Sequence, residues 1–191
     1  MDIDHHVAQR VRELRAASQL TLERLAEISG VSRSTISSIE RVETSPTAAV
    51  LHKLATAFGI PLAALFSESP GDTPQSPLSR AGDQPVWKDP ESGYVRRHVS
   101  PVGFPTPLEL AEVTFPGGKS VAFNSPSRSI VHHQLVWMLE GEMEITLGEK
   151  TWRLKVGDCL AMVLDKPLAF RNSTRKPARY AVALTQKPLR T

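Results

Sequence analysis

The segment from Thr21 to Arg41, TLERLAEISGVSRSTISSIER, constrains the fold of this chain most strongly, because two helical patterns meet in it at one break. Two helices joined by so short a break cross at a steep angle. Such a crossing needs a small side chain, a turn residue that tolerates positive φ, and a branched apolar side chain in the second helix. Ala26, Gly30 and Ile36 meet these needs in order. The apolar or small residues of each predicted helix are Leu22, Leu25, Ala26 and Ser29 in the first, and Val31, Thr35, Ile36 and Ile39 in the second.

The segment therefore predicts a helix-turn-helix whose second helix presents hydroxyls and arginines on its outward side. Thr21 and Ser32 stand where side chains cap the two helix starts. Short hydroxyls let a helix approach a DNA groove closely, and an arginine can bind a guanine edge through two hydrogen bonds or pair with a phosphate. A solvated, serine-rich surface is the alternative, since contacts rather than composition decide specificity. The residues predicted to bind DNA here are Thr21, Ser32, Arg33, Ser34, Ser37, Ser38 and Arg41.

Further helices are predicted on both sides of this segment. Val7–Ala17 shows one apolar face, and Ala48–Phe58 is followed by Gly59, which can end a helix. The backbone amides at the start of the second of these helices are a ready phosphate site, so Thr47 is predicted as a further DNA contact. A last turn is expected over Pro61–Phe66.

From Val7 to Phe66 the chain resembles the Cro and phage-repressor type of helix-turn-helix domain, the family often called XRE. The likeness includes the trailing pattern RVETSPTAAVLHKLATAFGIPLAALF, with Arg41, Pro46 and Gly59 in register. The resemblance implies an all-α DNA-binding domain of about five helices over residues 1–66. One departure is Leu22, because many members carry glutamine at the start of the first motif helix, where it braces the backbone and the recognition helix.

The net charge of +3 does not by itself predict DNA binding. Residues 1–66 carry as many positive as negative side chains, so the basic excess lies in the rest of the 191 residues. The prediction depends instead on where Arg33 and Arg41 point, because local fields matter more than total charge. The positive residues are Arg10, Arg12, Arg15, Arg24, Arg33, Arg41 and Lys53, and the negative ones are Asp2, Asp4, Glu13, Glu23, Glu27, Glu40 and Glu43.

Cysteine usage and the N-terminus indicate the compartment. Cys159 is the only cysteine, which excludes an intrachain disulfide and favours a reducing cytoplasm. It stands among apolar residues and is predicted to be a buried filler rather than a redox sensor. No apolar run could span a membrane, and MDIDHHVAQRVREL lacks the basic start and apolar core of a signal peptide. We therefore expect a cytoplasmic protein with no membrane partner.

After Phe66 the composition changes, and residues 67–85, SESPGDTPQSPLSRAGDQP, are predicted to be a flexible linker. From residue 86 onward the hydrophobic period becomes alternating, which predicts many short strands in a closed sandwich or small barrel. The predicted strands are Tyr94–Val99, Leu108–Phe115, Lys119–Phe123, Gln134–Leu139, Glu142–Leu147, Thr151–Leu154, Asp158–Val163, Leu168–Asn172 and Ala178–Leu184.

The stretch from Gln134 to Asn172 is similar to the two consensus motifs of the cupin barrel, with Gly141 closing the first motif and Gly157 opening the second. The resemblance implies an all-β jelly-roll (double-stranded β-helix) domain over residues 86–191. In metal-dependent cupins the first motif supplies two histidines and a glutamate, and the second a further histidine. Alignment on the glycines places Gln134 at the glutamate position and Leu168 at the last histidine position, so no metal, cofactor or catalytic centre is expected.

Strand alternation predicts an apolar cavity in the barrel with a small polar end, which suits a small organic effector. The alternative is that the same side chains simply fill the barrel. The opposite face of the same strand, with Leu135, Trp137 and Leu139, is available for an inter-sheet or subunit contact. The predicted effector-pocket residues are His132, Gln134, Val136, Met138, Leu160, Met162, Leu168 and Phe170.

The two parts together resemble a helix-turn-helix regulator that carries a C-terminal cupin as its sensor. The resemblance implies a non-enzymatic, sequence-specific transcriptional repressor, dimeric through the barrel. A dimer presents two recognition helices about one DNA turn apart, so a pseudo-palindromic double-stranded operator is expected. One alternative is a metal-dependent cupin enzyme, such as an isomerase or dioxygenase, fused to a DNA-binding domain. Another is an antitoxin-type regulator whose barrel binds a protein partner.

Overall fold

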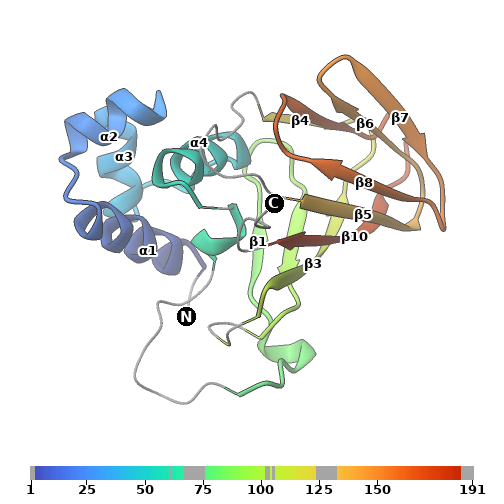
Figure 1. Cartoon of the computed structure of the whole chain (residues 1–191), viewed down its shortest axis with the longest axis horizontal. Coiled ribbons are helices and arrows are strands. Elements are labelled where there is room, and N and C mark those ends of the chain that lie inside the picture. Colours follow the sequence, from blue (N-terminus) through green and yellow to red (C-terminus); the bar gives the residue numbers. More distant parts are fainter. Residues whose placement is uncertain are drawn as a thin grey trace.

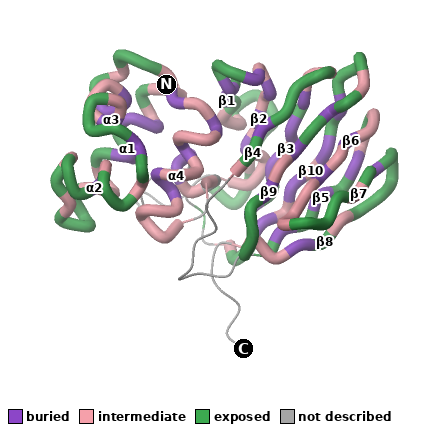
Figure 2. The backbone as a smooth tube through the Cα atoms, turned by 90° about the horizontal axis from the view of Figure 1, so that it is seen from above, coloured by how far each residue is buried: buried purple, intermediate pink, exposed green. Residues whose placement is uncertain are grey.

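The computed structural model describes residues 3–60, 62–66, 76–101, 104, 106–123 and 133–185. A helical domain lies on one side of the molecule and two β-sheets on the other (Figure 1). Figure 2 shows α4 as the helix of this domain next to the sheets, while α2 and α3 lie on the side away from them in both views. An all-α part followed by an all-β part is the order that the sequence predicts.

The helical domain contains α1 (Ile3–Ala17), α2 (Leu22–Ser29), α3 (Arg33–Glu40) and α4 (Ala48–Phe58), followed by the 3-10 turn η1 (Leu62–Leu65). The expected count of about five helices is wrong, since the described residues form four α-helices. Gly59 ends α4 in the left-handed conformation, with φ 68°. The residues that follow form only one short 3-10 turn, a conformation common in short pieces of chain.

The turn between α2 and α3 has the geometry that the sequence predicts. Gly30 adopts φ 65°, and its N–H donates to the carbonyl of Ala26 at 2.9 Å. An added Cβ at Gly30 would meet no atom within 4 Å, so glycine is favoured by the backbone angle and not by lack of space. Leu25 and Ile36 are both 0% exposed, which confirms Ile36 as the apolar plug of the second helix.

Arg15 fixes the C-terminal end of α3 to α1. Its Nε and Nη2 donate to the two carboxylate oxygens of Glu40 at 2.7 and 2.9 Å, and its Nη1 donates to the carbonyl of Leu20 at 3.1 Å. Arg12 also donates to the backbone carbonyl of Glu40. The hydrogen bond with Glu40 raises the pKa of Arg15 above its ordinary value. These bonds hold α3 in place on the rest of the helical domain.

The C-terminal part is a jelly roll of two antiparallel sheets, one ordered β1-β2-β3-β10-β5-β8 and the other β4-β9-β6-β7. This is the barrel topology that the cupin resemblance implies. The nine predicted strands correspond to β2 through β10, and the three-residue β1 was not predicted. The strands are β1 (Val86–Lys88), β2 (Val95–His98), β3 (Leu108–Phe115), β4 (Ser120–Phe123), β5 (His133–Glu140), β6 (Met143–Leu147), β7 (Lys150–Leu154), β8 (Cys159–Val163), β9 (Leu168–Arg171) and β10 (Ala178–Thr185).

Two residues of the cupin-like motifs have clear structural reasons. Gly141 adopts φ 75°, and a Cβ there would lie 3.0 Å from the Cα of Ala178. Asn172 is 0% exposed, and its amide donates to the carbonyls of Phe115 at 3.3 Å and Lys176 at 2.8 Å. The motif residues therefore fix the turns of the barrel even where no metal ligands accompany them.

The helical domain packs on the barrel along a seam that was not predicted. The rings of Phe66 and Trp87 lie 5.6 Å apart between centroids, and those of His52 and Phe123 lie 4.9 Å apart. Trp87 is only 1% exposed, so its side chain is buried against Phe66 of the helical domain, while Val86 of the same strand is 49% exposed. Residues 67–75 of the predicted linker lie outside the described residues, and the part from 76 to 85 includes the 3-10 turn η2 (Ala81–Asp83).

Candidate DNA-binding surface and barrel cavity

Two of the predicted DNA contacts cap the helices of the motif. Thr21 Oγ1 accepts a hydrogen bond from the N–H of Arg24 at 3.1 Å, and Ser32 Oγ accepts one from the N–H of Thr35 at 3.1 Å. The predicted capping roles of Thr21 and Ser32 are confirmed. Each hydroxyl satisfies an amide that the helix itself leaves without a partner.

Arg33 at the start of α3 and Arg41 just past its end are each paired with a neighbouring carboxylate. Arg33 Nε lies 2.6 Å from Glu23 Oε1, and Arg41 Nη2 lies 2.9 Å from Glu43 Oε2. The backbone N–H of Glu23 and the charge of Arg33 lower the pKa of Glu23. More than half of each of these four side chains is exposed. Exposed ion pairs contribute only about 0–1 kcal/mol, so a DNA phosphate or base edge can replace either carboxylate.

The serines of α3 differ in exposure. Ser32 and Ser34 are exposed, whereas Ser37 and Ser38 are partly buried. Ser32 Oγ lies 2.9 Å from Ser34 Oγ, so these two hydroxyls form one polar patch at the helix start. The N-terminal turn of α3 is thus the most accessible part of the predicted surface, and this is the part of a recognition helix that reaches base edges.

The start of α4 is closed by a residue of the barrel. The N–H of Ala48 donates to Asp89 Oδ1 at 2.9 Å, and Thr47 Oγ1 accepts from the N–H of Val50 at 3.4 Å. Ala48 and Asp89 are 1% and 2% exposed. The prediction that the amides of this helix start are open to a phosphate is wrong for Ala48, because a carboxylate of the barrel occupies that position.

The inner face of the barrel holds most of the predicted effector residues. Gln134 is 8% exposed and lies on the same face of β5 as the fully buried Val136, as strand alternation predicts. Leu160 is only partly buried. His132 lies outside the described residues. The other members of the predicted set are all buried, namely Met138, Met162, Leu168 and Phe170.

A cavity of about 440 Å³ lies where four strands of the larger sheet begin or end. Of the predicted effector residues, Gln134 and Met162 line it. Val136, Met138, Leu160, Leu168 and Phe170 do not, and Phe170 instead stacks on Tyr180 at 5.8 Å in the barrel core. At strand ends the two faces of the sheet meet, so outward-facing residues also contribute. The lining residues are Leu108, His133, Gln134, Leu135, Ala161, Met162, Val163, Ala183 and Thr185.

The outer face of the same sheet is apolar and exposed. Leu110, Leu135 and Trp137 are 42%, 47% and 51% exposed, and the small Ala183 pairs with both leucines across the neighbouring strands. Cys159 pairs with Trp137 and is exposed on this face. Its predicted burial is wrong, because strand alternation turns it away from the barrel interior.

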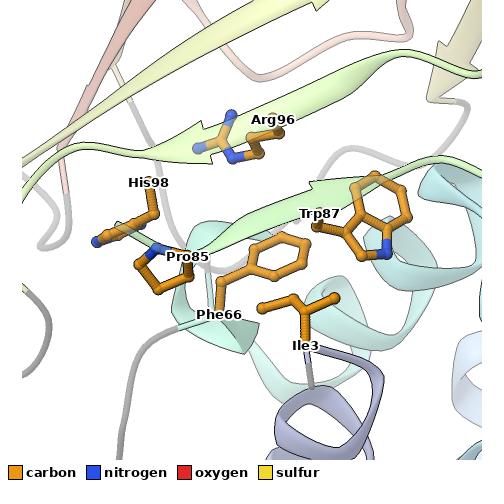
Figure 3. Close-up of a pocket in the computed structure, with 6 residues that line it drawn as sticks. All are labelled: Ile3, Phe66, Pro85, Trp87, Arg96 and His98. Carbon is orange, nitrogen blue, oxygen red and sulfur yellow. The ribbon is translucent and has the colours of Figure 1, made fainter. Parts of the chain in front are cut away.

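A buried ionic cluster of Arg96, His98 and Glu109 was not predicted from the sequence. Glu109 is 1% exposed, and its Oε1 lies 3.0 Å from Arg96 Nη2 and 3.2 Å from His98 Nδ1. Burial alone would raise the pKa of Glu109, but His98 and Arg96 lower it below its ordinary value. Figure 3 shows Arg96 and His98 on the strand side of a small pocket, with Phe66 and Ile3 of the helical domain opposite. Side chains alternate between the two faces of β2, and Arg96 and His98 lie on its buried face. This alternation was the signal in the sequence that could have revealed the cluster.

The donor set of a metal-dependent cupin is not present in the described residues. No three His, Cys, Asp or Glu side chains in that part of the chain gather in a way that could hold a metal ion. Gln134 and Leu168, at the aligned ligand positions, are both buried, and leucine offers no donor atom. Among the helices that the structure describes, none is both long and apolar enough to cross a membrane.

Known proteins resemble this chain over both of its parts. The helix-turn-helix family model HTH_3 matches residues 11–65. The HTH-type transcriptional regulator PuuR of Escherichia coli (strain K12) is 26% identical over 179 residues, 93% of each chain. Control protein C.SmaI of Serratia marcescens is 46% identical over 57 residues, 30% of this chain and 68% of that protein. The crystal structure of an HTH_3 family transcriptional regulator from Vibrio cholerae superposes with a TM-score of 0.73 at 23% identity, covering 96% of each chain. With the motif geometry of residues 22–40, these matches show that the chain belongs to the HTH_3, or XRE-type, helix-turn-helix family of transcriptional regulators.

Proposed function

We propose that this protein is a sequence-specific DNA-binding transcriptional repressor whose barrel binds a small-molecule effector without a metal. The observation that carries the proposal is the asymmetry of α3. Its inner residues Ile36 and Ile39 are 0% and 1% exposed, whereas Arg33 and Ser34 are exposed. The helix itself lies on the side of the helical domain away from the barrel (Figure 2). A helix anchored in this way can enter a major groove without disturbing the core.

The side chains of this surface have different roles in the proposal. Arg33 lies at the helix start and binds a guanine edge, while Arg41 lies past the helix end and pairs with a phosphate. The hydroxyls of Ser34, Ser37 and Ser38 lie along the same side and allow close approach to the groove. Thr21 and Ser32 cap their helices and place neighbouring backbone amides near the DNA backbone. Thr47 caps α4, where Asp89 holds the amide of Ala48, so the proposed contact of Thr47 is through its side chain.

The outer face of the larger sheet is the proposed homodimer interface. Leu110, Leu135 and Trp137 form an apolar surface around the small Ala183, which lets two such sheets approach closely. Two copies joined there carry two recognition helices, as a pseudo-palindromic operator requires.

The cavity at the strand ends is the proposed effector site. Its walls are mainly apolar, with the amide of Gln134, the imidazole of His133 and the hydroxyl of Thr185 at its edge. A small, largely apolar molecule with one hydrogen-bonding group fits this chemistry. Leu135 and Ala183 belong to both the cavity and the proposed dimer face. An effector in the cavity can therefore favour one arrangement of the dimer over another. Allosteric control requires such a difference in affinity between two arrangements.

One experiment tests the DNA-binding core of the proposal. The purified full-length protein is incubated with a pool of random duplexes, with and without metabolites extracted from cells, and the bound fragments are sequenced. We expect an enriched motif with two-fold symmetry whose enrichment changes with the extract. Binding without preference for any duplex at moderate salt would contradict the proposal.

A further inference from the structure

The seam between the two domains is closed around one carboxylate. Asp89 follows β1 directly, and its Oδ2 accepts hydrogen bonds from the N–H of Ser92 at 2.8 Å and from the hydroxyl of Ser92. The N–H of Asp89 donates to the carbonyl of Tyr94 at 2.9 Å. A turn of the barrel therefore orients this side chain, and the other oxygen, Oδ1, is the one presented to the helical domain.

That oxygen accepts from the first amide of α4. The N–H of Ala48 and Asp89 Oδ1 are 2.9 Å apart, and both residues are buried. The start of an 11-residue helix has unsatisfied amides and a partial positive charge, and so it attracts an anion. Here the anion already present is a side chain of the barrel.

The start of α4 lies close in sequence to α3, which carries the proposed DNA-binding surface. Only residues 41–47 separate the end of α3 from Ala48. When α3 occupies a groove, the DNA backbone beside it presents phosphates to nearby helix starts, which are common phosphate ligands. Asp89 and a phosphate cannot both accept from the N–H of Ala48.

Inside the seam, buried polar atoms oppose its closure. Trp87 Nε1 and Arg96 Nε belong to side chains that line the small pocket between the domains, and neither atom has a hydrogen-bond partner among the described residues. A buried donor or acceptor without a partner destabilises the closed arrangement, and water can satisfy such atoms once the domains separate. The aromatic contacts of Phe66 with Trp87 and of His52 with Phe123 favour closure instead. The seam thus combines favourable and unfavourable contacts, as a contact that opens and closes requires.

We propose that docking of the helical domain on the barrel is autoinhibitory, with Asp89 occupying the amide of Ala48 in place of a DNA phosphate. DNA binding then releases α4 from the barrel. This inference rests on the proposed DNA-binding function and adds the contact that regulates it.

The first test removes the charge of Asp89 in the full-length protein. Asp89→Asn keeps the shape of the side chain but weakens its hold on the helix start, so affinity for the selected duplex should rise roughly three- to tenfold. Ser92→Ala is the matched control, because it alters the same turn and leaves the bond between Asp89 and Ala48 in place. It should bind within about twofold of the wild type. A folded Asp89→Asn protein with unchanged or weaker affinity overturns the inference.

The second test keeps Asp89 and reports on the seam directly. Replacing Trp137 and Trp152 with Phe leaves Trp87 as the only tryptophan. Trp87 is 1% exposed between Phe66 and Tyr94, so release of α4 should shift its emission to longer wavelength and increase its quenching by acrylamide when DNA is added. Continued shielding of Trp87 with the duplex fully bound overturns the inference and leaves the proposed function standing. Absence of any duplex preference in both the wild type and Asp89→Asn overturns the two together.

Discussion

At the scale of single residues, the predicted reading surface divides into side chains that support the helix and side chains that only face outward. Ser32 caps α3, so Ser32→Ala would cost about 1 kcal/mol of stability as well as any DNA contact. Arg33 and Arg41 hold only exposed ion pairs, so their removal leaves the fold nearly unchanged. Substitution of either arginine therefore allows a change in DNA binding to be measured without a change in the stability of the fold.

Arg33→Ala should lower affinity by about 1–3 kcal/mol for sites with the preferred base at one position, because a bidentate contact to guanine is lost. Sequencing of selected duplexes should show relaxed preference at that position alone. Arg24→Ala is a matched control, since Arg24 is another arginine with more than half of its side chain exposed, and it pairs with Glu27 on α2. A selected motif identical to that of the wild type would remove Arg33 from the reading role.

Arg41→Ala should weaken binding to all duplexes alike, because a phosphate contact carries no sequence information. The slope of log K against log salt concentration should become shallower by about one. Titrations at several salt concentrations measure this slope. Equal slopes for Arg41→Ala and the wild type would show that the residue pairs with no phosphate.

The residues at the two positions where metal-dependent cupins carry ligands predict the metal content of the purified protein. With Gln134 and Leu168 where ligands are required, the purified protein should contain no stoichiometric transition metal after dialysis against a buffer without chelator. Elemental analysis by mass spectrometry measures the content. A retained equimolar metal that is lost in His132→Ala would instead favour the metal-dependent enzyme among the alternatives.

At the scale of elements, local patterns predicted most of the fold. The bounds of α4 match the prediction, because a helical apolar period ends at Gly59, and β3 matches because its alternation runs through eight residues. By contrast, β1 has three residues, too few to show a period. The bond between Ala48 and Asp89 joins residues 41 apart in sequence, and neither end carries a local signal of it. The sequence therefore predicted most helices and strands, but it did not predict the contacts between them.

The pairing of β2 with β3 places Glu109 beside Arg96 and His98 and gives a pH dependence of stability. Because the folded pKa of Glu109 is lowered, its contribution is complete above the unfolded pKa of about 4.3 and is lost as pH falls toward the folded pKa. Urea midpoints measured from pH 7 to pH 3 should fall more steeply below pH 4.5 for the wild type than for Glu109→Gln. Glu91→Gln, in an exposed turn, should keep the wild-type slope. Parallel curves for wild type and Glu109→Gln would contradict this role.

At the scale of the whole molecule, the surfaces with proposed functions lie on different sides. The helix α3 lies away from the barrel (Figure 2), and the seam lies between the domains. The apolar face of Leu110, Leu135 and Trp137 belongs to the larger sheet. The inward orientation of Gln134 followed from alternation, but the position of the cavity did not. Alternation assigns faces of strands, whereas the cavity forms at strand ends such as His133 and Thr185, where both faces meet.

Trp137→Glu should convert a dimer into monomers, because it places a charge in the middle of the apolar sheet face. Sedimentation equilibrium measures the mass, and affinity for the two-fold symmetric duplex should fall with it. Val156→Glu is the control, since Val156 is 63% exposed in the turn between β7 and β8 and belongs to neither sheet. An unchanged mass for Trp137→Glu would place any subunit contact elsewhere.

The proposed DNA contacts of Arg33 and Arg41 have a further consequence, because both arginines are already paired, with Glu23 and Glu43 respectively. A cation already balanced by a carboxylate gains little from an arbitrary stretch of duplex, so encounters at the wrong place are brief. Only where base edges add hydrogen bonds does the exchange of partners become favourable. We therefore expect Glu23 and Glu43 to shorten the time that the protein spends on non-target DNA and to leave more molecules free to search for the target.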